Sequence, residues 1–237
     1  MKKSIIALFI GLFSIVNVIH AQSLEDVLKK HFDAVGQEKL VKVKSFVVKA
    51  NVSQMGMEMP MFMQVKKPNM FRMEIDMQGQ KMIQAFDGEK GWMIAPWISA
   101  EPQELAGEQL KQAMDQADME GELYNYEKKG STVEFVGKVN LDGKAAYRLK
   151  LTDNQGNIKD YFIDADNYRV VKVKAKVEAM GQTAEVEQRM LDFQTINGIT
   201  MAMKIETDSP MGTAVITMEE VKFDEDLDNS IFQQPAK

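Results

Sequence analysis

An alternation of apolar and polar side chains, from about Lys42 to the end of the chain, constrains the fold more than any other feature. In VVKVKAKVEA (residues 170–179), valine and alanine alternate with lysine and glutamate. Successive side chains of a strand point to opposite faces, so this pattern predicts one dry and one solvated face. Turn pairs such as Asp87-Gly88, Asp142-Gly143 and Asn197-Gly198 separate the runs. The sequence therefore predicts about a dozen antiparallel strands joined by hairpins.

Two stretches depart from this alternation. SLEDVLKKHFDAVG (residues 23–36) has apolar residues at helical spacing between a serine cap and a glycine, which predicts one amphipathic helix. ISAEPQELAGEQLKQAMDQADMEGELYNY (residues 98–126) follows the fifth expected strand and predicts one or two short helices that start near Pro102. The fold class is thus mainly β (α+β), with a large curved antiparallel sheet, an N-terminal helix and a helical insertion. A single open sheet of this length must twist and curl, and its dry face then becomes concave.

The first 21 residues have the layout of a secretory signal peptide. Two lysines precede an apolar run from Ile5 to Ile19, and a small residue follows at Ala21. This run is shorter than the roughly 20 residues that span a bilayer. We expect cleavage after Ala21, a single domain over residues 22–237, and a soluble monomer in the periplasm, because the chain has no cysteine to carry a lipid anchor.

The composition argues against several classes of function. The chain has no cysteine and two histidines, of which His20 lies in the expected signal peptide and His31 in the expected helix. A histidine-dependent nucleophile or a zinc site of the usual kind cannot be assembled from these residues. The net charge of −6 argues against nucleic acid as a partner. We therefore expect no enzyme activity, metal or cofactor, although a carboxylate-dependent hydrolase remains as the least favoured alternative.

Methionine is unusually abundant and is placed regularly. The chain has 19 methionines, and in MGMEMPMFMQV (residues 55–65) they occupy every second position. Methionine is flexible and polarizable, and it is over-used on surfaces that accept varied ligands. A well-specified core would use stiffer residues. We interpret the row as part of an adaptable apolar cavity, the alternative being a core that favours methionine.

The candidate ligand-binding residues lie on the expected strands and in the insertion. Trp92 is either a core anchor or a ligand contact, and Trp97 is a candidate for the rim or the lid of the cavity. The full candidate set comprises Met55, Met57, Met59, Met61, Met63, Phe71, Met73, Ile75, Met77, Trp92, Trp97 and Met114.

Four segments, in order along the chain, resemble the LolA/LolB-like family of periplasmic lipoprotein carriers. They are VKKPNMFRMEI (residues 65–75), FDGEKGWMIAP (residues 86–96), YFID (residues 161–164) and EEVKFDEDLDNSIFQQP (residues 219–235). The resemblance implies an unclosed β-barrel with a helical lid over a hydrophobic cavity. It also implies lid control by Lys67, which stands where typical carriers have a lid-holding arginine; the alternative for Lys67 is a solvated lysine on an edge strand.

The resemblance further implies partners and a role. Carriers of this family receive acylated lipoproteins from an inner-membrane lipoprotein-releasing ABC transporter, shield the acyl chains, and deliver them to an outer-membrane receptor. In having no cysteine, the chain resembles the soluble carrier rather than the receptor, which is a lipoprotein. An alternative of the same fold is a periplasmic sensor or accessory protein that binds a free lipid or a hydrophobic metabolite.

Overall fold

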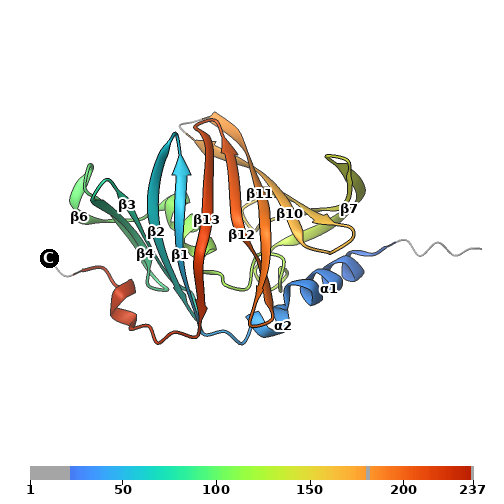
Figure 1. Ribbon diagram of the computed structural model, residues 1–237, viewed down its shortest axis with the longest axis horizontal. Coiled ribbons are helices and arrows are strands. Elements are labelled where there is room, and N and C mark those ends of the chain that lie inside the picture. The colour runs from blue at the N-terminus through green and yellow to red at the C-terminus, as the bar shows by residue number, and fades with distance from the viewer. Residues whose placement is uncertain (1–21, 180–181, 236–237) are drawn as a thin grey trace, which may run out of the picture.

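The computed structural model describes residues 22–179 and 182–235, and its main feature is one antiparallel sheet of 13 strands (Figure 1). The signal peptide expected at residues 1–21 lies outside the described residues. The strands are β1 (Ser45–Gln54), β2 (Met57–Lys66), β3 (Met70–Met77), β4 (Gln80–Phe86), β5 (Gly91–Ala95), β6 (Ser99–Glu104), β7 (Thr132–Leu141), β8 (Lys144–Thr152), β9 (Ile158–Asp164), β10 (Val170–Ala179), β11 (Gln182–Ile196), β12 (Ile199–Ser209) and β13 (Gly212–Phe223). The helices are α1 (Leu24–Val35), α2 (Gln37–Leu40), α3 (Gly107–Ala117) and the 3-10 helix η1 (Asn229–Phe232). Among the described residues, none of these helices has the length and hydropathy needed to cross a bilayer.

The strand order follows two meanders that meet at the centre of the sheet. Strands β1 to β6 run outward to one edge, strands β7 to β13 return from the other, and β1 pairs with β13. Within the described residues the edge strands β6 and β7 do not pair with each other, so the sheet is an unclosed barrel. This confirms the predicted fold class.

The connection from β6 to β7 crosses one face of the sheet. We call residues 105–131, which contain α3, the lid segment. One end packs on Val65, Phe71 and Phe86, and the other places Leu123 against Leu149 of β8. Because one short segment contacts both halves of the sheet, the sheet must curve around it, and α3 lies behind the central strands in Figure 1. The face that the lid segment covers is the concave face, and the opposite face is the convex face.

The two faces differ in chemistry as the alternation predicted. The convex face carries ion pairs, among them Lys172 with Glu187 at 2.7 Å and Lys174 with Glu187 at 3.0 Å. Burial raises the pKa of the Glu187 carboxyl, but hydrogen bonds and charge from the two lysines outweigh it and lower this pKa to about 2. The concave face carries the apolar clusters that form the core.

Helix α1 begins and ends as its sequence predicts. The Ser23 hydroxyl accepts from the Asp26 backbone N–H, the Asp26 carboxylate accepts from the Ser23 N–H, and together they form a capping box. Gly36 ends the helix at φ 73°, and a Cβ atom there would lie 2.1 Å from the carbonyl oxygen of Gly198. Glycine is required at position 36 by conformation and by space.

The expected helix start near Pro102 is wrong. Residues Ser99–Glu104 form β6, the edge strand beside β5, and the helix begins at Gly107. Proline has no N–H to donate, but an edge strand needs hydrogen bonds on one side only, so Pro102 is tolerated there. The helical insertion therefore follows the sixth strand rather than the fifth.

The segment after β13 packs on the convex face. The side chain of Phe232 in η1 is fully buried, and the backbone carbonyl oxygen of Phe232 accepts from Trp92 Nε1 at 2.8 Å. This contact fixes η1 against β5 on the convex face.

The buried imidazole of His31 should make stability depend on pH. His31 is 8% exposed, and its Nδ1 lies 2.9 Å from the carbonyl oxygen of Tyr168. Burial lowers the pKa of His31, and the hydrogen bond to Tyr168 offsets only part of this effect. Below pH of about 6.5 the unfolded chain then binds more protons than the folded chain, so the free energy of unfolding decreases as the pH is lowered.

We therefore expect the melting temperature to drop between pH 7 and pH 5, and to drop less in His31→Gln, which cannot take up this proton. The groups with the strongest depressions, such as Glu187, lose their contribution only at lower pH. Thermal melts of both proteins at the two pH values measure the difference. Equal drops in both proteins would show that His31 is not the responsible group.

The β1–β2 turn has an unusual residue at its tip. Met55 and Gly56 both have positive φ angles, 52° and 78°, as the tight two-residue hairpin turn requires. Asparagine and glycine favour this conformation, whereas an unbranched apolar side chain gains nothing from it. Replacing Met55 with Asn should therefore stabilise the protein by about 1 kcal/mol, measured by urea unfolding. A lower free energy of unfolding in the variant would contradict this expectation.

Candidate functional site

The methionine row lies on the concave face over most of its length. Met59 and Met61 on β2 are each 7% exposed and pack against Val48, Ala50 and Val52 of β1. Neighbouring strands add further thioethers and methyl groups, because Met61 pairs with Ile75 and Met63 with Met73. The row is part of a continuous apolar surface that spans β1 to β3 and β13.

The other candidates on β3 belong to the same surface. Met73, Ile75 and Met77 are half-buried and pack against the cluster around Met59. Phe71 is fully buried, pairs with Phe86 and lies under the lid segment. The structure thus brings together seven of the predicted residues: Met59, Met61, Met63, Phe71, Met73, Ile75 and Met77.

Three candidates lie at hairpin turns or near them, away from this packed surface. Met55 is 81% exposed in the β1–β2 turn, Met57 is 40% exposed directly after it, and Trp97 is 50% exposed between β5 and β6. Because β1 and β5 run in the same direction, these turns lie at one end of the sheet. We call this end, where β1 ends, the rim.

Met114 lies on α3 and is also half exposed. It lines a cavity of about 330 Å³ between α3 and the β8–β9 turn, whose wall includes Leu110 and Leu151 together with charged groups such as Lys111 and Asp153. Lys111 lies 3.1 Å from Asp153 and 3.0 Å from Asp115. This cavity is partly polar and lies to the side of the methionine row.

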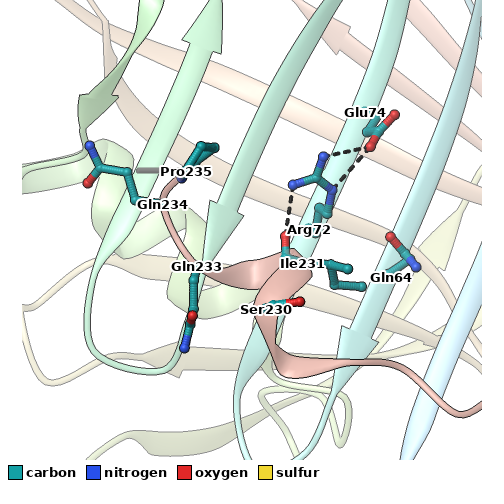
Figure 2. Close-up of a pocket in the computed structure, with 8 residues that line it drawn as sticks. All are labelled: Gln64, Arg72, Glu74, Ser230, Ile231, Gln233, Gln234 and Pro235. Atoms are coloured by element: carbon teal, nitrogen blue, oxygen red, sulfur yellow. Dashed lines mark hydrogen bonds and ion pairs between the residues drawn. The ribbon is translucent and has the colours of Figure 1, made fainter. Parts of the chain in front are cut away.

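Trp92 lies on the convex face, opposite the methionine row. It is 1% exposed, donates its indole N–H to Phe232, and has the Arg72 guanidinium 5.6 Å from its ring centroid. Figure 2 shows Arg72 between the Glu74 carboxylate and the carbonyl oxygen of Ile231, which accepts at 2.8 Å. Trp92 is therefore an anchor for the C-terminal segment, in line with its alternative interpretation as a core residue, and it is not part of the concave surface.

The pocket in Figure 2 is polar and lies between the sheet and the C-terminal segment. Its volume is about 540 Å³, and its wall is formed by Gln64, Arg72, Glu74, Ser230, Ile231, Gln233, Gln234 and Pro235. Side chains alternate between the two faces along β2, so Gln64, which follows Met63, points to the convex face and lines this pocket. This pocket is separate from the apolar surface of the concave face.

Polar contacts hold the lid segment on the concave face. Lys67 donates from Nζ to the carbonyl oxygen of Val41 at 2.6 Å and lies 2.8 Å from the Glu120 carboxylate. The Glu120 carbonyl oxygen also accepts from Gln37 Nε2 at 2.9 Å. Lys67 therefore contacts the lid segment, and these residues join it to β2 and to the N-terminal helices.

A second set of polar contacts holds the lid segment to the other half of the sheet. The Glu122 carboxylate accepts from Lys159 Nζ and from the Tyr161 hydroxyl, both on β9. Burial and the negative charge of Glu122 raise the pKa of Tyr161 well above its ordinary value. Within the lid segment, Lys129 lies 2.6 Å from Asp118. The lid segment is thus held by polar contacts at Glu120 and Glu122 and by apolar packing at Leu105, Ala113, Ala117 and Leu123.

Sequence reasoning missed several residues of this site. Val48, Val52 and Ile216 line the concave face beside the methionines, and the alternation of their strands identifies their face. Gln37 and Glu120 carry no such signal, because a polar residue that contacts the lid looks in sequence like any solvated residue.

The comparisons with known proteins agree with this architecture. Residues 64–236 match the model of a family described as "Uncharacterized protein". No curated protein matches the sequence.

Several solved structures have a similar fold at low identity. A LolA superfamily protein from Nitrosomonas europaea is 16% identical, with a TM-score of 0.59 over 88% of this chain and 96% of that one. A domain named for outer membrane lipoprotein sorting, from Vibrio parahaemolyticus, is 10% identical, with a TM-score of 0.59 over 87% and 97%. A DUF1329 family protein from Desulfovibrio piger is 14% identical, with a TM-score of 0.58 over 87% and 97%.

These structural similarities show the fold alone, and the family match covers most of the chain. The chain belongs to the family whose model, described as "Uncharacterized protein", matches residues 64–236, and it has the fold of the LolA superfamily.

Proposed function

We propose that this protein is a non-catalytic carrier that shields the acyl chains of lipoproteins on its concave face and moves them from the inner to the outer membrane. In this role it is exported by residues 1–21 and works as a soluble periplasmic protein. It takes its cargo from an inner-membrane lipoprotein-releasing ABC transporter and passes it to an outer-membrane receptor.

One observation carries this proposal: a methionine-rich apolar face lies under a segment that is fixed by polar contacts. Burial of an acyl chain is favourable by about 0.8 kcal/mol for each CH₂ group. The methionine side chains at positions 59, 61, 63, 73 and 77 are long and unbranched. Met57 continues the row to the rim. Flexible thioethers can repack around chains of different shape.

The lid segment explains how such a face could be both dry and accessible. The lid segment packs beside Met63 and Met73, whereas Met59 and Met61 are buried among side chains of β1, β3 and β13. An acyl chain can therefore enter only if the lid segment moves off Met63 and Met73 or the side chains around Met59 and Met61 repack. Ion pairs such as Lys67 with Glu120, each side chain 28% exposed, hold the lid segment without burying a charge completely. Contacts of this kind are weak enough to open and re-form.

Mass spectrometry of material that co-purifies with the protein from the native periplasm tests the proposal. Intact acylated lipoproteins are the expected cargo. Free lipids or hydrophobic metabolites in their place would show instead that the same face serves a sensor or accessory protein.

A further inference from the structure

Exposed apolar side chains gather at the rim. Among the described residues, eight large hydrophobic side chains are exposed, and five of them lie in three hairpin turns at this end of the sheet or directly after one: Met55, Met57, Trp97, Ile98 and Met211. Single exposed apolar residues need no explanation, but five at one end of the sheet do. Side chains with this exposure add little to the stability of the fold, so the fold does not account for them.

The strand register steps evenly from one turn at the rim to the next. The residue pairs that close the four turns are Ser209 with Gly212, Gln54 with Met57, Met77 with Gln80, and Ala95 with Ser99. The pairings between neighbouring hairpins place each of these pairs two residues further along the sheet than the next one.

This even step brings the turns level with one another in a barrel. Two residues span about 7 Å along a strand, and two strand spacings span about 10 Å across the sheet, so the line through the turns slopes by about 35°. Strands of a barrel are tilted by about 35–45° from its axis, and this tilt cancels the slope. The four turns therefore project to about the same height along the barrel axis, and the β1–β2 and β12–β13 turns lie at the upper edge of the sheet in Figure 1.

The tips of these four turns carry no charge. They are formed by Met55-Gly56, Gln78-Gly79, Pro96-Trp97-Ile98 and Pro210-Met211. Asp208 lies behind the last of them, but its carboxylate is 2.8 Å from Arg189 and is compensated there. The turns at the opposite end of the sheet are charged, as in Lys67-Pro68-Asn69 and Asp87-Gly88-Glu89-Lys90. The rim thus complements a surface that is apolar beneath and has no net charge.

We propose that the rim docks on a bilayer of zwitterionic lipids, with Met55, Trp97, Ile98 and Met211 inserted among the headgroups. Tryptophan is enriched at membrane interfaces because its ring is apolar and its N–H is polar. Neighbouring turns are about 10 Å apart. A second copy of the chain would therefore meet separate tips rather than a face that buries about 800 Å² on each partner. A fluid bilayer closes around each tip.

This docking goes beyond the proposed function, because the tips can insert whatever the concave face binds. It also complements that function. Met57 lies at the rim, and Met59, Met61 and Met63 follow it on the same face of β2. The methionine row therefore leads from the bilayer surface into the concave face.

Sedimentation of cargo-free protein with vesicles of phosphatidylcholine and phosphatidylethanolamine tests the docking. The wild-type protein should bind, and the double variant Met55→Gln/Met211→Gln should bind about tenfold more weakly, because binding strength scales with the apolar area buried in the interface. Met114→Gln is the matched control, since Met114 is 50% exposed but lies on α3. The three side chains are exposed, so the variants should fold, which circular dichroism verifies.

Tryptophan fluorescence locates the contact. The chain has two tryptophans, of which Trp97 is 50% exposed at the rim and Trp92 is 1% exposed on the convex face. Vesicles with brominated phosphatidylcholine should quench part of the emission of the wild-type protein. They should quench none of it in Trp97→Phe, which keeps an aromatic ring at the rim and should still bind.

Several results would overturn the proposal. They are a wild-type protein that does not bind these vesicles, a double variant that binds as tightly, a control that loses binding equally, and quenching that persists in Trp97→Phe. Binding that requires anionic lipids and is lost at high salt would also overturn it, as would a dimer that forms through the rim without vesicle binding. Failure of this test leaves the proposed cargo untouched, because the protein is assayed without cargo.

Discussion

Met63→Glu is expected to bind a fluorescent fatty acid at least tenfold more weakly than the wild-type protein. Met63 lies on β2 in the concave face and is half-buried between Val48 and Met73. An acyl chain that enters beside position 63 would remove water from the new carboxylate. Mutational series give a cost of about 1–3 kcal/mol for burying a polar group without a partner, and a charged group costs more. Fluorescence titration gives the dissociation constant, and a thermal melt shows whether the variant is folded at the temperature of the assay.

Gln64→Glu is the matched control because it adds the same charge one residue along β2. Gln64 points to the convex face, where it lines the polar pocket of Figure 2. Its variant should bind the fatty acid as the wild-type protein does. A folded Met63→Glu protein with unchanged affinity would exclude the concave face as the acyl-binding surface, and an unfolded one would return the methionines to a structural role.

Lys67→Met is expected to open the lid segment. The substitution keeps the aliphatic length of the side chain but removes the hydrogen bond to Val41 and the ion pair with Glu120. Hydrogen bonds to charged groups contribute about 1.5–3 kcal/mol each, and exposure of the pair reduces this contribution. We expect backbone hydrogen exchange in the lid segment, residues 105–131, to accelerate about tenfold, which corresponds to about 1.4 kcal/mol in the free energy of local opening.

Lys67→Arg provides the control for this experiment. Its guanidinium retains the charge and several donors, so it should hold the carboxylate of Glu120 and keep exchange close to the wild-type rate. Exchange that stays slow in Lys67→Met would show that Lys67 does not control the lid segment. Acceleration throughout the sheet, rather than in the lid segment alone, would point to general destabilisation.

The alternation of side chains made most of this fold predictable from sequence. Turn pairs such as Asp142-Gly143 and Asn197-Gly198 do lie between strands, because few residues other than Gly, Asn and Asp adopt the required positive φ angles. Helix α1 was predictable for a similar reason, since Ser23 and Gly36 satisfy its ends locally.

Features that depend on tertiary contacts were not predictable in this way. Pro102 is common at helix starts and on edge strands, and only its pairing partner, β5, decides between them. Trp92 alternates correctly within β5, but the sequence does not state which face of that strand is concave. Its convex position follows from the C-terminal segment, which supplies the acceptor at Phe232. The partners of Lys67 likewise come from segments distant in sequence.

The most direct test of the central claim uses the methionines themselves as probes. In protein labelled with ¹³C at the methionine methyl groups, a fatty acid with a nitroxide near its chain end should broaden the resonances of the concave face. The resonances expected to broaden are those of Met59, Met61, Met63, Met73 and Met77. If the acyl chain leaves these five resonances unchanged and broadens only exposed ones such as Met114 or Met211, the concave face does not hold the ligand.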